Sequence, residues 1–376
     1  MKRTKKKRTK KRTTTSSSRN YSQHNHHDTA HFVFGTAGQG CHMARPDDPT
    51  TSAWVLGWET VDLQDYQGLS VPDVALDDDV LCVCNLRTDQ HVTAYVTVYD
   101  QTLYGRSMGR HQRTPLQTGT ATSEEDGSTR TCTTLIVLCP PLTMARLCTL
   151  EQPPSPSSSP EDWPLKSDVQ VWTPHLHPDD EHTRCIGFPL LCRGDNHGKG
   201  GSDSNICNDQ NLPTSYLCTQ SEGGVLTHFF AGNYHALDFA CPVGTPLLAV
   251  ADGVVVEAHA RYQRVSGIDV ANLFQWNAIM LRVDNDDNDP LFVEYVHIAT
   301  TSVQTGDRVT VGQVIGTSGS IGFSPEPHLH LAAYRSANPQ ACTVRVRFQK
   351  ASEPDQTFLP KAGQYYNSNG VAEGQK

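Results

Sequence analysis

The chain has 376 residues, enough for two domains of ordinary size, and carries a formal net charge of -9. Its 28 Gly and 23 Pro favour turns and short strands and argue against long helices. No stretch approaches the ~20 consecutive apolar residues that a membrane-spanning helix requires, so no transmembrane segment is predicted.

The first segment, residues 1–50, is predicted to be a disordered basic tail. Residues 1–20 contain ten Lys or Arg and no acidic residue, which leaves 21 of the 31 basic residues against all 40 acidic residues in the remainder. Such a tail is suited to an anionic partner or an import receptor. No apolar run follows the basic residues, so we expect a soluble protein without an ordinary secretory signal, either intracellular or exported by a non-classical route.

Residues 51–150 are predicted to form a β-sandwich-like accessory domain. Segments 80–85, 92–99 and 132–139 are rich in Val, Thr and Tyr and alternate at period two, which predicts strands. Short strands separated by turn residues are typical of an antiparallel sandwich. Because no reactive side chains cluster in this segment, it is assigned an accessory role.

A Pro/Ser-rich linker is predicted at 151–164, where four Ser and five Pro leave no means of forming a core. A second domain is predicted at 165–348, with its core at 215–348, followed by a C-terminal tail at 349–376. Strand patterns return in that core with turn signals between them, so the predicted fold class is all-β with antiparallel sheets. The expected strands are 247–250, 253–257, 278–283, 291–297, 309–315 and 328–334.

His328 and His330 belong to a Pro-His-Leu-His motif near the end of this domain. Residues two apart on a strand project from the same face, with their Cα atoms about 7 Å apart. One imidazole can therefore bind a metal while the other lies beside it. A catalytic zinc takes imidazole and carboxylate ligands and keeps one position for water, so two His and one Asp suffice. The same four residues occur at 174–177 without a strand pattern and are interpreted as a loop.

Four pieces of this domain form an ordered set. They are a Thr-His pair at 227–228, an Asp that precedes a Gly-Thr-Pro turn at 244–246, a His that ends a strand at 297, and a Gly-Thr-Ser-Gly loop at 316–319 that leads to the His-x-His. As a set, they resemble the lysostaphin/LytM-type zinc metalloendopeptidases, which have the duplicated hybrid motif fold. The resemblance implies an open groove between antiparallel sheets and a site that binds Zn²⁺.

Carried over onto this sequence, the resemblance implies that Asp238 and His330 are zinc ligands. It also implies that His297 and His328 are catalytic: they orient or deprotonate the attacking water and stabilise the oxyanion. Histidine suits both duties because its unperturbed pKa is near 6.5, so that the neutral ring can accept the water proton and the protonated ring can stabilise the oxyanion.

The remaining ligand is open between two histidines. The common family spacing is His-x-x-x-Asp, but Tyr234 occupies the position four before Asp238. His235 is three before it, an odd offset that would send the two side chains to opposite faces of a strand. His228 is ten before it and follows Thr227, as in relatives that use a Ser/Thr-His and a longer gap. His228 is therefore favoured, with His235 as the alternative.

The predicted function is zinc-dependent hydrolysis of peptide bonds, and the resemblance points to peptidoglycan cross-links as substrate. One alternative is a catalytically inactive family member that acts as a binding or scaffolding module; the departure from the usual first His favours it, whereas the presence of both His297 and His328 argues against it. Another alternative is a zinc hydrolase that acts on an intracellular peptide, which the basic tail suggests.

Overall fold

The structure is a computed structural model of the chain. It describes residues 31–34, 41–46, 56–61, 80–85, 91–100, 103–104, 117–141, 143–151, 165–172, 184–194, 210–224, 226–228, 232–284, 289–338 and 341–372. These residues form strands and turns, with one 3-10 turn, η4 (Val270–Asn272), so the all-β prediction is confirmed. No helix in the described part has the length and apolar character to cross a bilayer.

Several predicted segments lie outside the described residues. They are the basic residues 1–20, the linker apart from residue 151, and the second Pro-His-Leu-His at 174–177. Within the bounds predicted for the N-terminal tail, however, β1 (His31–Phe34) and β2 (Cys41–Pro46) are strands that pair with each other.

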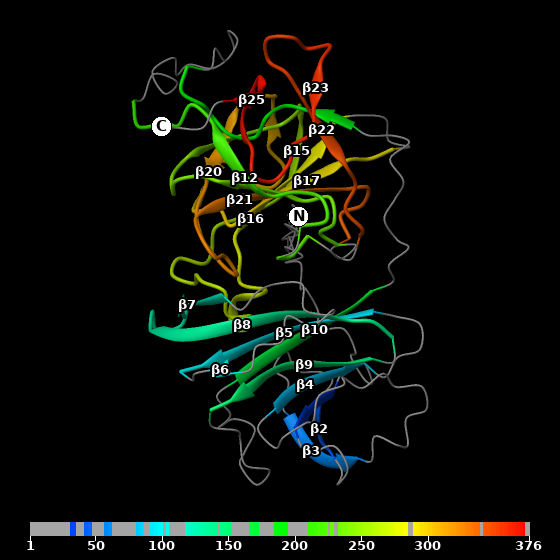
Figure 1. Cartoon of the computed structure of the whole chain (residues 1–376). Helices are drawn as coiled ribbons and strands as arrows, with labels where there is room; N and C mark the ends of the chain where they lie inside the picture. The colour runs from blue at the N-terminus through cyan, green and yellow to red at the C-terminus, as the bar shows by residue number, and fades with distance from the viewer. Residues whose placement is uncertain are drawn as a thin grey trace, which may run out of the picture.

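Two antiparallel sheets make up the N-terminal part, in the lower half of Figure 1. One has the strand order β3-β2-β1-β4-β9-β6 and the other β10-β5-β8-β7. Strand β4 contacts both β5 and β8, so the sheets pack on one another as in the predicted sandwich. The remaining strands of this part are β3 (Leu56–Val61), β4 (Val80–Asn85), β5 (His91–Tyr99), β6 (Leu103–Tyr104), β7 (Gln117–Thr122), β8 (Thr129–Cys139), β9 (Thr143–Leu150) and β10 (Leu165–Trp172).

Strand β10 corrects the predicted domain boundary. From sequence, residues 165–172 are predicted to belong to the second domain because they follow the linker. In the structure they pair antiparallel with β5 over the whole length of β10, from Leu165 opposite Val98 to Trp172 opposite His91. The residue pattern identifies a strand but not its partner, and the partner here precedes the linker. The N-terminal unit therefore extends to residue 172.

The C-terminal part is built on a nine-stranded sheet with the order β19-β15-β16-β17-β21-β13-β12-β24-β25. It lies in the upper half of Figure 1, with smaller sheets β14-β20-β18 and β11-β22-β23 beside it. Its strands are β12 (Tyr216–Gln220), β13 (Leu237–Ala240), β15 (Gly253–His259), β16 (Ala278–Val283), β17 (Phe292–Val296), β19 (Arg308–Val309), β21 (His328–Tyr334), β24 (Tyr365–Asn367) and β25 (Gly370–Ala372). The smaller sheets contain β11 (Arg184–Ile186), β14 (Pro246–Leu248), β18 (Thr300–Thr301), β20 (Val314–Thr317), β22 (Val346–Gln349) and β23 (Thr357–Phe358).

The predicted C-terminal tail, 349–376, is also corrected. Strand β24 pairs with β12, and β25 pairs with β24, so residues 365–372 complete one edge of the large sheet. The Tyr366 ring is buried and stacks on Phe358 with centroids 5.7 Å apart. Short strands interrupted by Gly and Asn gave no periodic signal, although their aromatic rings fill the core.

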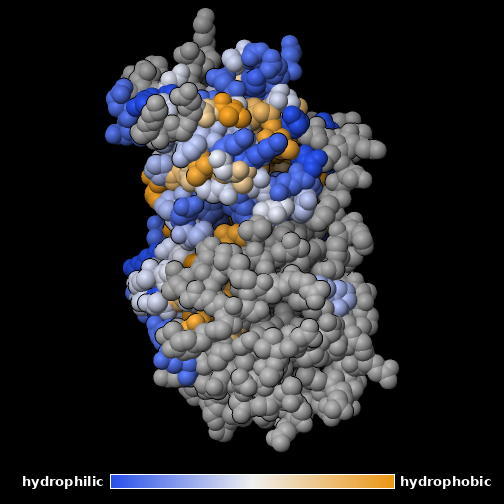
Figure 2. All heavy atoms as spheres, viewed as in Figure 1, coloured by the Kyte–Doolittle hydropathy of each residue, from blue (hydrophilic) through white to orange (hydrophobic). Residues whose placement is uncertain are grey.

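The main core lies between the large sheet and the two smaller ones. All seven residues of β21 are buried, which shows that this strand is covered on both faces. Fully buried side chains include Phe239, Leu281, Tyr295 and Leu329. On the face shown in Figure 2, the described hydrophobic areas are small and separated by hydrophilic ones. The strands that carry the candidate site residues are thus held in the middle of a packed structure.

Candidate metal centre

Asp238 and His330 face each other across neighbouring strands. In the pairing of β13 with β21, Asp238 lies directly opposite His330. Side chains of opposite residues project from the same face of an antiparallel pair. Accordingly, Nδ1 of His330 lies 2.9 Å from Oδ1 of Asp238, and both residues are buried.

His228 reaches the same point from a turn outside the sheet. Its Nε2 lies 3.3 Å from Nδ1 of His330 and 3.3 Å from Oδ1 of Asp238. The side chain is completely buried. One ligand atom from each of these three residues lies within 4.8 Å of the others, and no other such group of His, Cys, Asp or Glu occurs among the described residues.

His235 lies elsewhere. Its Nδ1 is 3.4 Å from Oε1 of Glu222, which also forms an ion pair with Arg345. Its backbone amide donates to the hydroxyl of Thr343. The odd offset from Asp238 is consistent with this separation, because the two side chains leave the chain in different directions. Of the two alternatives, the structure brings His228 to Asp238 and His330.

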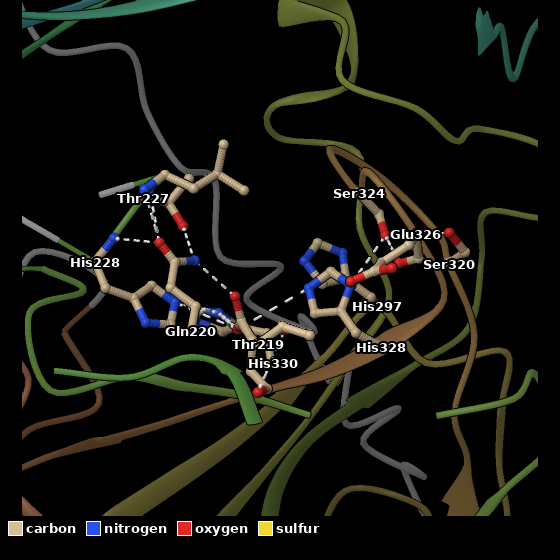
Figure 3. A network of polar contacts seen from close by, with 12 residues as sticks. Thr219, Gln220, Thr227, His228, His297, Ser320, Ser324, Glu326, His328 and His330 are labelled. Carbon is tan, nitrogen blue, oxygen red and sulfur yellow. Dashed lines mark hydrogen bonds and ion pairs between the residues drawn. The ribbon is translucent and has the colours of Figure 1, made fainter. Parts of the chain in front are cut away.

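Gln220 joins the turn that carries His228 to the sheet, and no sequence motif indicates this role. Its side-chain amide donates to Oδ2 of Asp238 at 2.8 Å, and its Oε1 accepts the backbone amides of Leu226 and Thr227 at 2.9 Å each (Figure 3). It is 6% exposed, so these bonds form away from water. An isolated Gln on a strand carries no recognisable signal, which is why the contact pattern alone reveals its role.

His297 and His328 form a second pair beside this cluster (Figure 3). Their ring centroids are 4.6 Å apart, and Nε2 of His328 lies 4.0 Å from Oδ1 of Asp238. Nδ1 of His297 lies 2.7 Å from the carbonyl oxygen of Ile321, and Nδ1 of His328 lies 2.7 Å from that of Glu326. Because a carbonyl oxygen only accepts, each neutral ring carries its proton on Nδ1 and leaves Nε2 unprotonated.

The glycine-rich loop at 316–319 has a steric explanation. A Cβ on Gly319 would lie 2.6 Å from the carbonyl oxygen of His297, and one on Gly316 would lie 2.4 Å from that of Thr300. His297 itself has φ 65°, a left-handed conformation that is uncommon for residues other than glycine. Only glycine, which has no side chain, lets this loop come so close to the strained segment that carries His297.

Burial and neighbouring charges determine the charges of Asp238 and His297 at neutral pH. Burial acts to raise the pKa of Asp238, but the surrounding histidines, His228 first, outweigh burial and hold that pKa well below its usual range. Burial lowers the pKa of His297 well below its ordinary value of 6.5, and the nearby rings of His328 and His330 lower it further. At neutral pH, Asp238 is therefore an anion and His297 is neutral.

The three clustered donors suit a tetrahedral metal ion. Zinc binds imidazole nitrogen and carboxylate oxygen at 2.0–2.2 Å, and two such ligands in tetrahedral geometry lie about 3.3 Å apart. The observed separations among His228, Asp238 and His330 are 3.3, 3.3 and 2.9 Å. Two imidazoles and one carboxylate are also ligands that zinc accepts at catalytic sites. The residues present therefore fit the ion.

Comparison with known proteins agrees with this geometry. The model of peptidase family M23 matches residues 232–342, a segment that contains Asp238, His297, His328 and His330 and begins just after His228. Glycyl-glycine endopeptidase ALE-1 of Staphylococcus capitis is 37% identical over 141 residues, which are 38% of this chain and 32% of that protein. Peptidoglycan DD-endopeptidase ShyC of Vibrio cholerae is 31% identical over 134 residues, which are 35% of this chain and 28% of that protein.

Among solved structures, the catalytic domain of lysostaphin from Staphylococcus simulans is 28% identical, with a TM-score of 0.25, over 34% of this chain and 85% of that domain. The chain spans about a third or less of the length of the two endopeptidases named above. The match to the family model covers the strands that meet at Asp238 and His330. Residues 232–342 are thus a segment of this chain that matches peptidase family M23.

Proposed function

We propose that the protein is a zinc metalloendopeptidase that hydrolyses peptide bonds in peptidoglycan cross-links. The observation that carries the proposal is the convergence of one nitrogen each from His228 and His330 with a carboxylate oxygen of Asp238, at 2.9 to 3.3 Å from one another. These three residues would hold the ion. When bound, zinc would polarise a scissile carbonyl and lower the pKa of a coordinated water towards ~7.

The protein groups around that centre supply proton transfer. His297 is neutral at neutral pH, and its Nδ1 donates to the Ile321 carbonyl, so Nε2 can accept the proton of an attacking water. His328 is held in the same tautomer by Glu326 and, once protonated, can donate to the tetrahedral oxyanion or to the leaving amine. Asp238 remains ionised and balances the positive charge that develops nearby.

The names of the relatives support a peptidoglycan substrate. One is a glycyl-glycine endopeptidase and another is a peptidoglycan DD-endopeptidase. The bond cleaved here therefore belongs to a cross-link peptide, with a glycyl bond and a D-amino-acid bond as the two choices to be tested.

The experiment is hydrolysis by the full chain, loaded with one equivalent of zinc, of a pentaglycine peptide and of a purified cross-linked muropeptide, with products identified by mass spectrometry. We expect one of them to be cleaved, and cleavage to disappear in His330→Ala. Stoichiometric zinc binding with no cleavage of either substrate would favour the non-catalytic binding module instead.

A further inference from the structure

The long connection between β15 and β16, residues 260–277, is held by the N-terminal sheet. The Glu124 carboxylate, in the turn between β7 and β8, accepts three successive backbone amides of this connection at 2.7 to 3.1 Å. The next residue is bound as well: Thr122 and Ser266 form a β-bridge with both backbone hydrogen bonds present. The three amides that Glu124 binds belong to Gln263, Arg264 and Val265.

Further along the connection, buried polar contacts repeat this attachment. Thr97 of β5 accepts the backbone amide of Val270 at 2.9 Å, and Thr97 has no exposed surface. The Tyr99 hydroxyl donates to Asp269 at 2.5 Å, and Asp269 in turn caps η4 through the amide of Ala271. A buried hydroxyl or amide that loses its hydrogen-bond partner destabilises the fold, so these contacts fix the register of this interface.

An apolar cluster seals the same contact. It joins two side chains of the N-terminal sheet to four from the C-terminal part, all of them less than 10% exposed. The Tyr95 and Phe323 rings are packed nearly perpendicular to each other, with centroids 6.2 Å apart. The cluster consists of Tyr95, Ile136, Ile268, Val270, Leu273 and Phe323.

The connection is joined to the loop at 319–326, which holds the two histidines. The Gly322 amide donates to the Val265 carbonyl at 3.0 Å, and Gly267 forms a β-bridge with Ser324. In the same loop, the Ile321 carbonyl accepts from His297, while Ser324 and the Glu326 carbonyl contact Nδ1 of His328. Fixed contacts therefore run from β5 and Glu124 through 260–277 to both rings.

We infer that the N-terminal sheet is a positioning element for the active site: by holding residues 260–277 it fixes the 319–326 loop, and with it the orientation and tautomer of His297 and His328. The inference rests on the proposed function for its catalytic consequence. Glu124 and Tyr99 are positioning residues, because they act on the histidines only through the two connected loops.

The test uses the zinc-loaded full chain with Glu124→Ala and Tyr99→Phe, and with Glu125→Ala as control, since the Glu125 side chain is exposed beside Glu124. The chain is labelled with ¹⁵N-histidine so that ring Nδ1–H signals can be followed by NMR. We expect both variants to bind zinc as wild type does, to lose or broaden these signals, and to lose kcat about tenfold with little change in KM. The control should match wild type in every measurement.

Tyr99→Phe keeps the ring and removes one hydroxyl, so it remains folded even if Glu124→Ala does not, as thermal melting will show. Unchanged ring signals and unchanged kcat in Tyr99→Phe would overturn the inference. Faster hydrolysis would overturn it too, because the sheet would then obstruct the site instead of ordering it. If wild type cleaves no peptide, the proposed function fails alone, and the ring signals still decide whether the sheet positions the histidines.

Discussion

Gln220 and Asp238 are joined by a buried hydrogen bond of 2.8 Å, through which one side chain links the turn of His228 to the sheet that carries the other two candidate ligands. The family spacing places the first His four residues before the Asp, whereas here His228 lies ten residues before Asp238, in a separate turn. Gln220 connects that turn to the sheet, since its Oε1 accepts the backbone amides of residues 226 and 227.

Removal of this link should weaken metal binding. We expect Gln220→Ala to lower zinc affinity about 10- to 100-fold, the usual effect of losing a group that orients a ligand. Isothermal titration calorimetry of the metal-free full chain measures it. Gln304→Ala is the control, because that side chain is exposed on a turn. Equal affinities in Gln220→Ala and wild type would show that the turn holds His228 without help.

Metal analysis of variants distinguishes the two candidates for the remaining ligand, His228 and His235. His228→Ala should lose bound zinc after dialysis, because it removes one of three converging donors. His235→Ala should retain one zinc per chain, because that ring contacts Glu222 instead. The opposite result would assign the ligand to His235 and would require the turn at 226–228 to move.

Replacement of His297 or His328 should reduce catalysis without reducing metal binding. We expect His297→Asn and His328→Gln to reduce kcat by at least about a hundredfold, since positioned acid–base groups contribute factors of that size. Zinc content should remain at one per chain in both. A variant that loses metal as well as activity would instead identify the altered histidine as a ligand.

The stability of the metal-free protein should depend on the charge of His297. Its pKa is lowered in the folded chain by burial, so the unfolded chain binds its proton near pH 6.5 while the folded chain does not. Proton uptake on unfolding makes stability fall as pH drops below 6.5, by up to about 1.4 kcal/mol per pH unit from this group. Urea titrations between pH 8 and pH 5.5 should therefore show a steeper decline for wild type than for His297→Asn. Parallel declines would show that this ring is not buried neutral.

The close approach of Gly319 to the backbone of His297 predicts that a side chain at position 319 is not tolerated. A methyl group there would lie 2.6 Å from the His297 carbonyl oxygen, which is backbone and cannot swing away. Gly319→Ala should therefore destabilise the chain and displace His297, whereas Gly306→Ala, with open space around it, tests only the cost of a positive φ. Differential scanning calorimetry and peptide hydrolysis compare the two. Equal activity in both variants would mean that the loop has room to shift.

Local patterns sufficed for the strands and for much of the site. The strands predicted at 80–85, 278–283 and 328–334 match observed strands, because the residues within each segment are enough to indicate a strand. Even spacing placed His328 and His330 on one face, where the structure has them. The position of His228, by contrast, could only be left as one of two alternatives.

Features that depend on contacts between residues far apart in the chain could not be predicted from the sequence. Strand β10 is recognisable as a strand, but nothing in residues 165–172 indicates that it pairs with β5. Gln220 is one polar residue on a short strand, and its importance arises from a turn and a sheet that meet only after folding. Likewise, the attachment of Glu124 to three amides some 140 residues away depends on backbone geometry that no side-chain pattern encodes.

The interface between the N-terminal sheets and the C-terminal part limits where the chain can be cut into folded fragments. A fragment that starts at residue 165 would carry β10 away from β5 and leave its backbone groups without the strand that satisfies them. It would also bring Ile268, Leu273 and Phe323 into water. Exposed strand edges and apolar side chains promote self-association. Expressed without the N-terminal sheet, the C-terminal part would tend to aggregate, so biochemical work should keep the two parts together.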